Sequence, residues 1–450
     1  MAPTGIPWRL LWANYRLPDP NLNGYLFPRK SLTGMTSKPI SRKMKSRPVE
    51  GVKFPPIVCV GFPRWEGSDY LSSTVQLMGE LAKTDRVLYV DYPFTYKDLV
   101  DAHLGNNPGV PAAELRGTAP RLQPRTLANG ATLQLLRLPP FVPANFLNSP
   151  VYFDRINQWN ARRAGRAILA ALKKLGWEQP IVINAFNPAL GNMLAGTLNE
   201  SLLVYYCYDE ISAAFWIARH GTRHERTFLQ RADLTIVSST GLYGAKFGQA
   251  KNCALVKNGV DLSLFKSQGT RPGDLPWQPI MGYIGTVDDR LDFELLEALA
   301  QAYPSCTLVF VGRVLATKQA AQLARFPNVH LLGPRPAATL GDYLAAFKLG
   351  LIPFVKNDLT AGIYPLKINE YLALGLPVVA TDFADLSDFI RFLQVGTTTS
   401  GFIAATGAIL ATENTADANA RRAFAQLNSW TGRALEMRRL LHQEWTKKQT

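Results

Sequence analysis

Short apolar runs recur along the chain, and a polar or glycine-containing loop follows each of them. Ile57–Val60 is followed by a loop, an amphipathic stretch covers Leu71–Ala82, and Val87–Val90 is the next apolar run. This order of strand, loop, helix and strand is the βαβ unit of a parallel sheet. The alternation continues with apolar runs at 134–139, 181–184, 202–206, 234–237 and 255–256 and with helices at 153–175 and 221–232. Residues 101–130 are rich in Pro, Gly, Asn and Arg, so we expect a long loop or an insertion there.

A second series of the same kind follows a Gly- and Pro-rich linker, SQGTRPGDLPWQP. Strands are expected at 281–284, 308–311, 329–332, 349–354 and 376–380, and helices at 293–302, 339–347 and 367–374. A chain of 450 residues is longer than one hydrophobic core usually serves. The pattern therefore predicts an α/β protein divided into an extension at 1–54, domains at 55–265 and 266–415, and a helix at 416–450.

Positive charge is concentrated at the start of the chain. The net charge is +15, and residues 1–53 hold ten basic and two acidic residues, hence +8. Such an excess favours polyanions: nucleic acid, anionic lipid or phosphorylated substrates. Trp8, Leu11 and Trp12 alternate with Arg9, as in an interfacial membrane helix, although a segment packed on the domain or a mobile arm has the same pattern. No RNA-binding signature is present, so nucleic acid is not expected as a partner.

The compartment expected from the sequence is the cytoplasm, with peripheral attachment to the inner face of a membrane as a separate expectation. The four cysteines are far apart and form no CxxC pair, which argues against a zinc site and a disulfide framework. No apolar run reaches the roughly 20 residues of a membrane span, and residues 1–30 lack the apolar core of a secretory signal. The helix at 153–175 has a basic face that is either solvated or lies on anionic lipid: Arg155, Arg162, Arg163, Arg166, Lys173 and Lys174.

The clearest chemical pattern is the stretch YPLKINEYLALGLPVVAT, at 364–381. A loop with Tyr364 leads into a short helix that ends at Gly375, and a β-branched strand follows. Lys367 and Glu370 are three residues apart, which places both on one face of the first helical turn. Backbone N–H groups and a lysine at a helix start attract phosphate, and a carboxylate one turn further on can accept hydrogen bonds from ribose hydroxyls. A surface salt bridge between the two side chains would explain the same spacing.

Further candidates stand at the carboxyl ends of the expected strands, where open α/β sheets bind ligands. Gly285 and Gly312 each follow a strand and let a phosphate approach the backbone, while Arg313 is either a partner for a diphosphate or a surface arginine. Asp209 is the candidate for taking a proton from an acceptor hydroxyl, with helix capping as the structural alternative. The loop after the first strand supplies the acceptor-side candidates: Arg64, Trp65 and Glu66.

No metal site is expected from the sequence. Asp288 and Asp289 are adjacent acids on a loop without a third ligand nearby. His220 and His224 are four residues apart, and their charged neighbours favour a solvated helix face over a zinc pair.

Several segments together carry a family resemblance. They are GYIGTVDDRLDFELLEALA, LVFVGR, NVHLLGPRP and YPLKINEYLALGLPVVAT in the second half, NGVDLSLF before the linker and, more loosely, INAFNP and VYYCYDE. Over roughly residues 55–440 the chain resembles a GT-B glycosyltransferase of the bacterial group 1 / family 4 type. The resemblance implies two Rossmann-like domains with a cleft between them, an acceptor domain first and a nucleotide-sugar donor domain second. It also implies that the C-terminal helix packs back on the first domain.

The resemblance implies particular roles in the donor domain. Glu370 corresponds to the acidic residue that binds the donor ribose. The glutamate that is usual eight residues earlier is Gly362 here, so no carboxylate meets the donor sugar from this position. The basic pair usual on the first loop of this domain is reduced to Arg290. Diphosphate binding would then rest on Lys367, Arg313 and backbone amides.

The activity that the resemblance implies is metal-independent transfer of a hexose-like unit from a nucleotide-diphosphate sugar to a lipid-linked, polysaccharide or small-molecule acceptor. The nucleotide sugar is a co-substrate, and no cofactor is expected. Asp209 stands where many members carry a histidine, which leaves retention or inversion open. One alternative is a sugar-nucleotide 2-epimerase of the same fold, which needs more acid–base residues than the sequence offers. The other is a non-catalytic nucleotide-sugar or carbohydrate-binding partner, supported by Gly362 alone.

Overall fold

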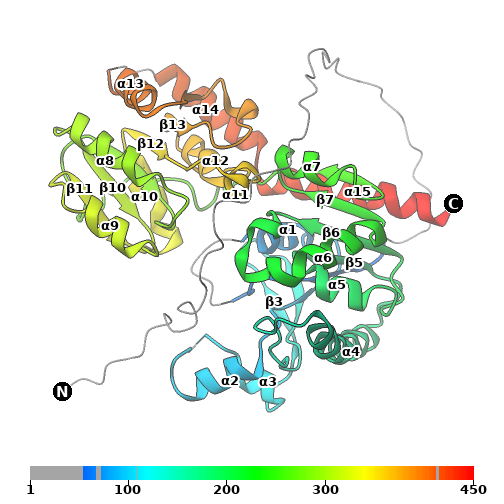
Figure 1. The fold of residues 1–450 in the computed structure, drawn as a ribbon. Coiled ribbons are helices and arrows are strands. Elements are labelled where there is room, and N and C mark those ends of the chain that lie inside the picture. Colours follow the sequence, from blue (N-terminus) through cyan, green and yellow to red (C-terminus); the bar gives the residue numbers. More distant parts are fainter. Residues whose placement is uncertain (1–53, 67–71, 108, 412–414) are drawn as a thin grey trace, which may run out of the picture. The chain divides into compact units, whose positions relative to one another are not determined.

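Two parallel sheets organise the part of the chain that the structure describes (Figure 1). The structure is a computed structural model that describes residues 54–66, 72–107, 109–411 and 415–450. The expected α/β class is confirmed. The expectations for the basic extension, including Trp8, Leu11 and Trp12, lie outside the described residues.

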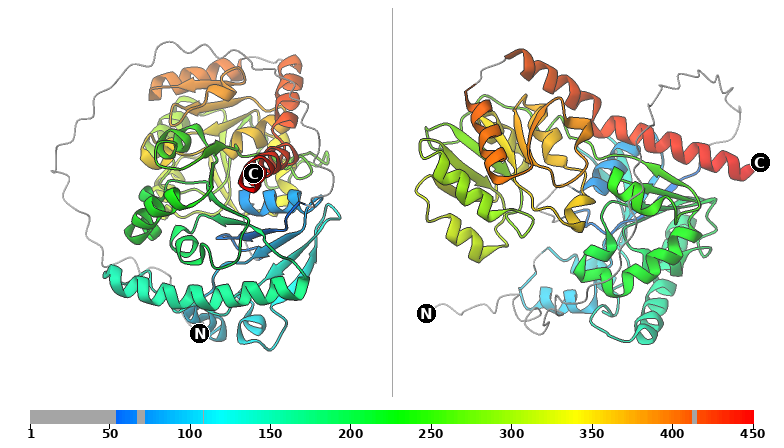
Figure 2. Two further views of the ribbon diagram at one scale, coloured as in Figure 1. Left: turned by 90° about the vertical axis from the view of Figure 1, so that its right-hand side faces the viewer. Right: turned by 45° about the horizontal axis from the view of Figure 1, so that its top comes forward.

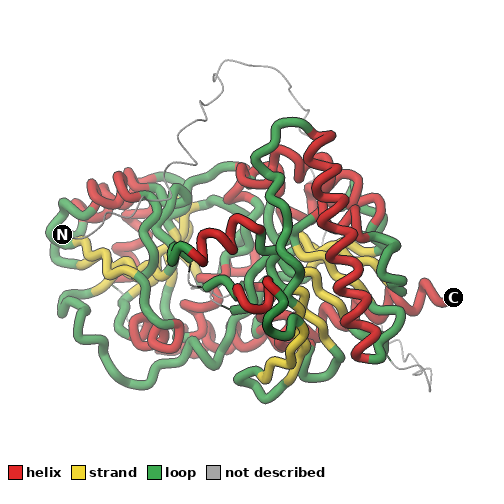
Figure 3. The backbone as a smooth tube through the Cα atoms, turned by 90° about the horizontal axis from the view of Figure 1, so that it is seen from below, coloured by secondary structure: helices red, strands yellow, loops and turns green. Residues whose placement is uncertain are grey.

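The first sheet has eight strands in the order β3-β4-β2-β1-β5-β6-β7-β8, and only the β3–β4 pair is antiparallel. The strands are β1 (Ile57–Val60), β2 (Val87–Val90), β3 (Leu122–Thr126), β4 (Thr132–Leu136), β5 (Ile181–Ala185), β6 (Leu202–Cys207), β7 (Leu234–Val237) and β8 (Cys253–Leu255). The central strands are buried along their whole length, as expected for a parallel sheet that is covered on both faces. Figure 3 shows strands in yellow with helices in red beside them.

The helices of this half are α1 (Ser73–Leu81), α2 (Tyr96–His103), α3 (Ala112–Arg116), α4 (Pro150–Leu175), α5 (Pro188–Leu194), α6 (Phe215–Arg231) and α7 (Thr240–Lys246). Figure 2 shows α4 as the long helix in green-cyan, and it packs against α5. It begins with Pro150 after Ser149 and ends at Gly176 in the left-handed conformation, both common helix boundaries.

The long loop expected at 101–130 is wrong in part. The segment contains the end of α2, all of α3 and the strand β3, which forms a hairpin with β4 through Asn129 and Gly130. β3 lies at the edge of the sheet, where Pro124 can be accommodated without disrupting a central strand. The composition of β3 therefore resembles that of a loop, although β3 pairs as a strand.

The second sheet has six strands, all parallel, in the order β11-β10-β9-β12-β13-β14. They are β9 (Ile280–Ile284), β10 (Thr307–Val311), β11 (Val329–Gly333), β12 (Leu349–Ile352), β13 (Val378–Thr381) and β14 (Leu393–Gly396). The helices of this half are α8 (Phe293–Ala302), α9 (Thr317–Leu323), α10 (Leu340–Ala345), α11 (Asp358–Ala361), α12 (Leu366–Ala373) and α13 (Thr399–Leu410). The Phe347 ring packs on Gly282 in the middle of β9, where a Cβ would lie 1.9 Å from the ring.

The segment expected as one helix at 416–450 is two helices, α14 (Thr415–Leu427) and α15 (Trp430–Gln449). Ser429 begins α15, because its side chain accepts a hydrogen bond from the Gly432 N–H. α14 packs on α12, whereas α15 lies beside α1 of the first sheet, red against blue in Figure 2. Arg438 of α15 pairs with the buried Asp85 at 2.8 Å. None of the helices in the described residues has the length and apolar character needed to cross a membrane.

Candidate functional site

A cavity of about 160 Å³ is lined by residues that follow strands of both sheets. Tyr208 and Asp209 follow β6, and Asn258 belongs to the NGVD segment. From the second half come Arg290 and the Tyr364–Lys367 segment at the start of α12. The structure thus brings together the carboxylate and the lysine that the sequence singled out in separate halves.

Lys367 lies in the first turn of α12, and its side chain extends over Gly285. A Cβ on Gly285 would lie 2.2 Å from the Lys367 Cε, and the Gly285 φ of 144° is one that residues with a side chain rarely adopt. The Lys367 Nζ lies 5.5 Å from the centroid of the Tyr283 ring and 5.8 Å from that of Phe354. Burial, and secondarily the nearby Arg290 charge, lower the pKa of Lys367 to about 8. The charged form of this amine is therefore disfavoured in the empty cavity, and a bound anion would stabilise it.

Glu370 lies one turn further along α12 and is half-buried. Burial raises the pKa of Glu370 to about 7, while Lys367 opposes this rise. The charges of the two side chains act on each other, because Glu370 opposes the fall in the pKa of Lys367. Tyr371 fixes the position of the helix, because its hydroxyl accepts a hydrogen bond of 3.0 Å from the Ile284 N–H at the end of β9.

Arg290 is a cavity residue to which the sequence analysis assigned no role. It pairs with Asp288 through two hydrogen bonds of 2.9 and 2.7 Å, and its guanidinium lies 5.7 Å from the centroid of the Phe354 ring. Arg290 is the only basic residue of the loop after β9, and this was the signal available in the sequence. The pairing also gives Asp288 a role: its carboxylate is a partner of the Arg290 guanidinium.

Asp209 follows β6 and is half-buried in the cavity wall. Burial raises the pKa of Asp209 to about 6; Arg290 opposes this rise, and Glu210 adds to it. The structural alternative for Asp209, helix capping, is wrong, because the residue that caps the following 3₁₀ turn, η2 (Ile211–Ala213), is Glu210. The carboxyl group of Asp209 is therefore in contact with the cavity, and it titrates in the range where a general base is useful.

Arg313 does not line the cavity. Its side chain is exposed at the carboxyl end of β10, and its carbonyl accepts a hydrogen bond of 2.8 Å from the Val287 N–H. Gly312 before it has a φ of 151°, and a Cβ there would lie 2.1 Å from the Gly285 carbonyl oxygen. The glycine at 312 thus serves the close approach of two loops, and the role of Arg313 toward a diphosphate stays a prediction.

The acceptor-side candidates are fixed onto the first sheet, and none of them lines the cavity. The Trp65 N–H donates to Asp91 at 2.8 Å, and its ring lies 4.9 Å from that of Tyr89. The Arg64 guanidinium lies over the Phe94 ring at 4.8 Å, and Glu66 pairs with Arg137 and Arg125 at 2.5 and 2.7 Å. Ser73, at the start of α1, does line the cavity, although the sequence offered no reason to single it out.

The expected solvated histidine face is wrong. His220 and His224 are buried, because α4 covers that side of α6. The His220 ring stacks on Phe153 at 4.0 Å between centroids, and the His224 Nε2 lies 2.9 Å from an oxygen of Asp154. No group of three or more His, Cys, Asp or Glu side chains in the described residues is arranged to hold a metal ion.

Comparison with known proteins matches residues 278–421 to the family model described as Glycosyl transferases group 1. The match contains the donor-side candidates of the cavity. One curated relative is TuaH of Bacillus subtilis (strain 168), named as a glycosyltransferase of teichuronic acid biosynthesis, with 29% identity over 174 residues. The alignment covers 36% of this chain and 44% of TuaH, so the chain spans less than half of that relative.

Solved structures match nearly the whole chain. Anabaena Alr3699/HepE, crystallised with UDP, has a TM-score of 0.57 and 16% identity, covering 87% of this chain and 100% of that one. The α,α-trehalose-phosphate synthase (UDP-forming) of Burkholderia vietnamiensis has a TM-score of 0.60 and 10% identity, covering 88% and 100%. These neighbours establish the fold as GT-B, with two Rossmann-like halves, as the sequence predicted.

Proposed function

We propose that this chain, which shares the GT-B fold and carries the group 1 glycosyltransferase match at 278–421, transfers a sugar from a nucleotide-diphosphate sugar to a hydroxyl acceptor. The observation that supports this proposal is the cavity in which Asp209 of one half meets Lys367 and Arg290 of the other. We assign residues 55–265 to the acceptor side and 266–415 to the donor side.

Binding of the donor would use the second half. Lys367 and Arg290 supply two cations beside the start of α12, where free backbone N–H groups add to the attraction for phosphate. Glu370, one turn along, would accept hydrogen bonds from the ribose hydroxyls. The nucleotide bound to Alr3699/HepE is UDP, which makes a uridine donor the first to test.

Transfer requires that charge be stabilised on the leaving group and that a proton be removed from the acceptor. The acceptor oxygen attacks the anomeric carbon, its proton passes to Asp209, and the bond from that carbon to the diphosphate oxygen breaks with its electrons on the phosphate. Lys367 and Arg290 would stabilise that charge, so we expect transfer without a metal ion. Activity in EDTA should equal activity in added Mg²⁺, and a loss of more than about tenfold in EDTA would contradict this assignment.

A thermal-shift screen of UDP-, GDP- and dTDP-sugars tests the donor. A ligand at 100 times its Kd stabilises the folded state by about 2.7 kcal/mol, which raises the Tm by several degrees. One nucleotide series should raise the Tm of the wild type and have little effect on a Lys367→Met/Arg290→Met variant. If every series leaves the wild-type Tm unchanged, or raises the Tm of both proteins equally, the proposed donor site is wrong.

The acceptor is proposed to be a glycan or a lipid-linked glycan, by analogy with the named role of TuaH. The exposed basic face of α4 suits peripheral attachment to an anionic leaflet, because Trp159 and Leu169 are also exposed beside its arginines. Sedimentation with anionic liposomes should fall when residues 1–50 are deleted and when Arg162 and Arg166 are replaced by Glu. Replacing Lys447 and Lys448 of α15 by Glu is the matched control. If the full-length protein does not sediment, the attachment is refuted.

A further inference from the structure

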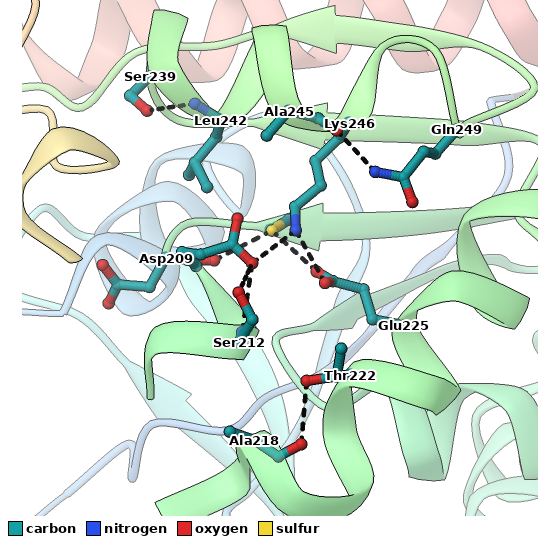
Figure 4. A network of polar contacts seen from close by, with 12 residues as sticks. Asp209, Ser212, Ala218, Thr222, Glu225, Ser239, Leu242, Ala245, Lys246 and Gln249 are labelled. Carbon is teal, nitrogen blue, oxygen red and sulfur yellow. Dashed lines mark hydrogen bonds and ion pairs between the residues drawn. The ribbon is translucent and has the colours of Figure 1, made fainter. Parts of the chain in front are cut away.

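Lys246 is a buried cation outside the cavity. It is the last residue of α7 and is only 4% exposed. Its Nζ lies 2.8 Å from an oxygen of Glu225 and 2.9 Å from an oxygen of Glu210. Figure 4 shows the Lys246 side chain pointing toward Glu225, with dashed lines for its polar contacts. Burying a lysine is costly unless it is paired, and here one amine is shared by two carboxylates from different segments. The arrangement links α7, α6 and the turn that carries Asp209.

Glu225 anchors this cluster to the core. Its second oxygen accepts a hydrogen bond of 2.8 Å from the Tyr205 hydroxyl and a weaker one of 3.5 Å from the Cys207 thiol. The Cys207 sulfur also lies 3.2 Å from the carbonyl oxygen of Asp209. The residue immediately after Asp209 and the residue two positions before it are therefore both bound to groups of the Lys246 cluster.

The other end of α7 contacts the donor half. The Ser239 hydroxyl donates to the Gly362 carbonyl at 2.6 Å, and the Thr240 hydroxyl donates to Asp385 at 2.6 Å. A Cβ on Gly241 would lie 2.5 Å from the Ala361 carbonyl oxygen, so the first turn of α7 is in direct backbone contact with this segment. One short helix thus connects the end of α11 to the turn that holds Asp209.

We propose that Lys246 is a positioning residue for the transfer reaction: through Glu210 it fixes the orientation and the charge environment of the Asp209 carboxylate. The inference rests on the proposed role of Asp209 as proton acceptor. A merely structural ion pair would contribute to stability alone, because a buried pair can often be replaced by apolar groups without loss of the fold. Because Glu210 is the residue next to Asp209, loss of Lys246 should change the reaction itself, whereas loss of a purely structural ion pair would change only the stability.

The charge effect has a definite sign. The groups that face Asp209 are Glu210 beside it, Arg290 and Lys367 across the cavity, and the tyrosines Tyr206, Tyr208 and Tyr364. Burial works to raise the pKa of Glu210, but Lys246 and the Ser212 contacts outweigh it, so the pKa is lowered and Glu210 is held ionised. Lys246 also balances the charge of Glu210. When Lys246 is removed, the two hydrogen bonds from Ser212 still favour the ionised form of Glu210. The Glu210 charge then acts on Asp209 without the balance of Lys246 and raises the pKa of Asp209. A base must be deprotonated to act, so the acid limb of the rate profile should move to higher pH.

The test compares four variants in nucleoside diphosphate release from the donor found by thermal shift. Lys246→Met/Glu225→Gln removes the buried pair with little change in volume and keeps an acceptor for Tyr205. We expect its kcat to fall at least tenfold and its acid limb to move up by about half a pH unit, with the Kd for nucleoside diphosphate within twofold of wild type. Glu225→Gln leaves the bond from Lys246 to Glu210 in place and should keep the wild-type profile. Lys246→Arg should restore most of kcat.

The fourth variant, Glu210→Gln, covers the case in which the double variant does not fold. It removes a negative charge beside Asp209, so its acid limb should move to lower pH, opposite to the double variant. If the folded double variant has wild-type kcat and pH profile, or if Glu210→Gln leaves the limb unmoved, the positioning role is refuted. If Asp209→Asn retains activity, the proposed role of Asp209 fails whatever the other variants show.

Discussion

Replacement of Lys367 by methionine should weaken the binding of a nucleoside diphosphate about 10- to 100-fold at pH 7. Methionine keeps the apolar contacts of the lysine stem over Gly285 and removes only the charged end. The expected change therefore isolates the interaction between the amine and the diphosphate.

The magnitude follows from the environment of the amine. The pKa of Lys367 lies at about 8 in place of 10.5, so the empty site disfavours the charged form by at most about 3 kcal/mol. At pH 7 the amine is already charged in the empty site, so this cost is present before the diphosphate binds and does not enter the difference. What the replacement removes is the charge-assisted hydrogen bond to the diphosphate, about 1.5–3 kcal/mol. Because about 1.4 kcal/mol is tenfold in Kd, the loss on replacement should be one to two orders of magnitude.

The pH dependence gives the same prediction a second readout. Below pH 8 the free Lys367 is already protonated, so binding to the wild type should be at full strength. Above pH 8 the free Lys367 is mostly neutral, and it must take up a proton from solvent when the diphosphate binds. Each further unit of pH should therefore weaken wild-type binding by up to tenfold. The terminal phosphate and Glu370 are already ionised between pH 8 and 9.5, so neither contributes in that window.

Isothermal titration calorimetry with UDP at pH 7.0, 8.0 and 9.0 measures both effects. Lys174→Met, which removes an exposed lysine of α4 outside the cavity, is the matched control and should bind as the wild type does. The reasoning is refuted if Lys367→Met binds within twofold of the wild type at pH 7, or if the two proteins weaken in parallel between pH 8 and 9.

Three further changes test other parts of the structure. Glu370→Gln should weaken UDP about tenfold at pH 8 and leave 2′,3′-dideoxy-UDP unaffected; calorimetry with both ligands checks this, and equal weakening of the two would exclude a ribose contact. The transfer rate should rise as the pH rises through about 6, because Asp209 is active when deprotonated. Asp209→Asn should lose most of the rate and also this dependence of the rate on pH. If the pH dependence of the variant is unchanged, another residue is the base. Gly312→Ala should destabilise the fold by about 2–4 kcal/mol in urea unfolding, because its Cβ would lie 2.1 Å from a carbonyl oxygen. Gly333→Ala is the control: Gly333 has a φ of 75° but open space around it, so the change should cost about 1 kcal/mol. Equal losses of stability would contradict the close approach of the two loops.

The hydrophobic pattern predicted the apolar strands well, including β11 at a sheet edge, and missed the two polar edge strands, β3 and β14. Strands such as 57–60 and 87–90 are buried on both faces, so their apolar runs coincide with the observed bounds. β3 and β14 lie at sheet edges and carry polar residues or proline, so they gave no such run.

The sequence could place candidate residues relative to one another where they lie on one helix. Lys367 and Glu370 share one helical turn, so their relation could be inferred from three residues of separation. Arg290 enters the cavity because its loop turns back on Asp288, and Ser73 because α1 begins beside the same edge. Such placements depend on tertiary packing, which a single sequence does not display.

The cluster around Lys246 illustrates the same limit. Its members Tyr205, Glu210, Glu225 and Lys246 are spread over more than forty residues of sequence, and no spacing rule joins them. A lysine at the end of a short helix was indistinguishable from a solvated one until the fold placed it between two carboxylates.

The central claim is that the cavity between Asp209 and Lys367 transfers a sugar from its donor. The most direct measurement is NMR of the purified protein with the nucleotide sugar that raises its Tm, with and without an extract of glycan acceptors. We predict release of nucleoside diphosphate in step with a new glycoside, abolished in Asp209→Asn, with no change in the configuration of unreacted donor. Unchanged donor in the presence of the acceptors, or an epimerised donor without any acceptor, would contradict the account.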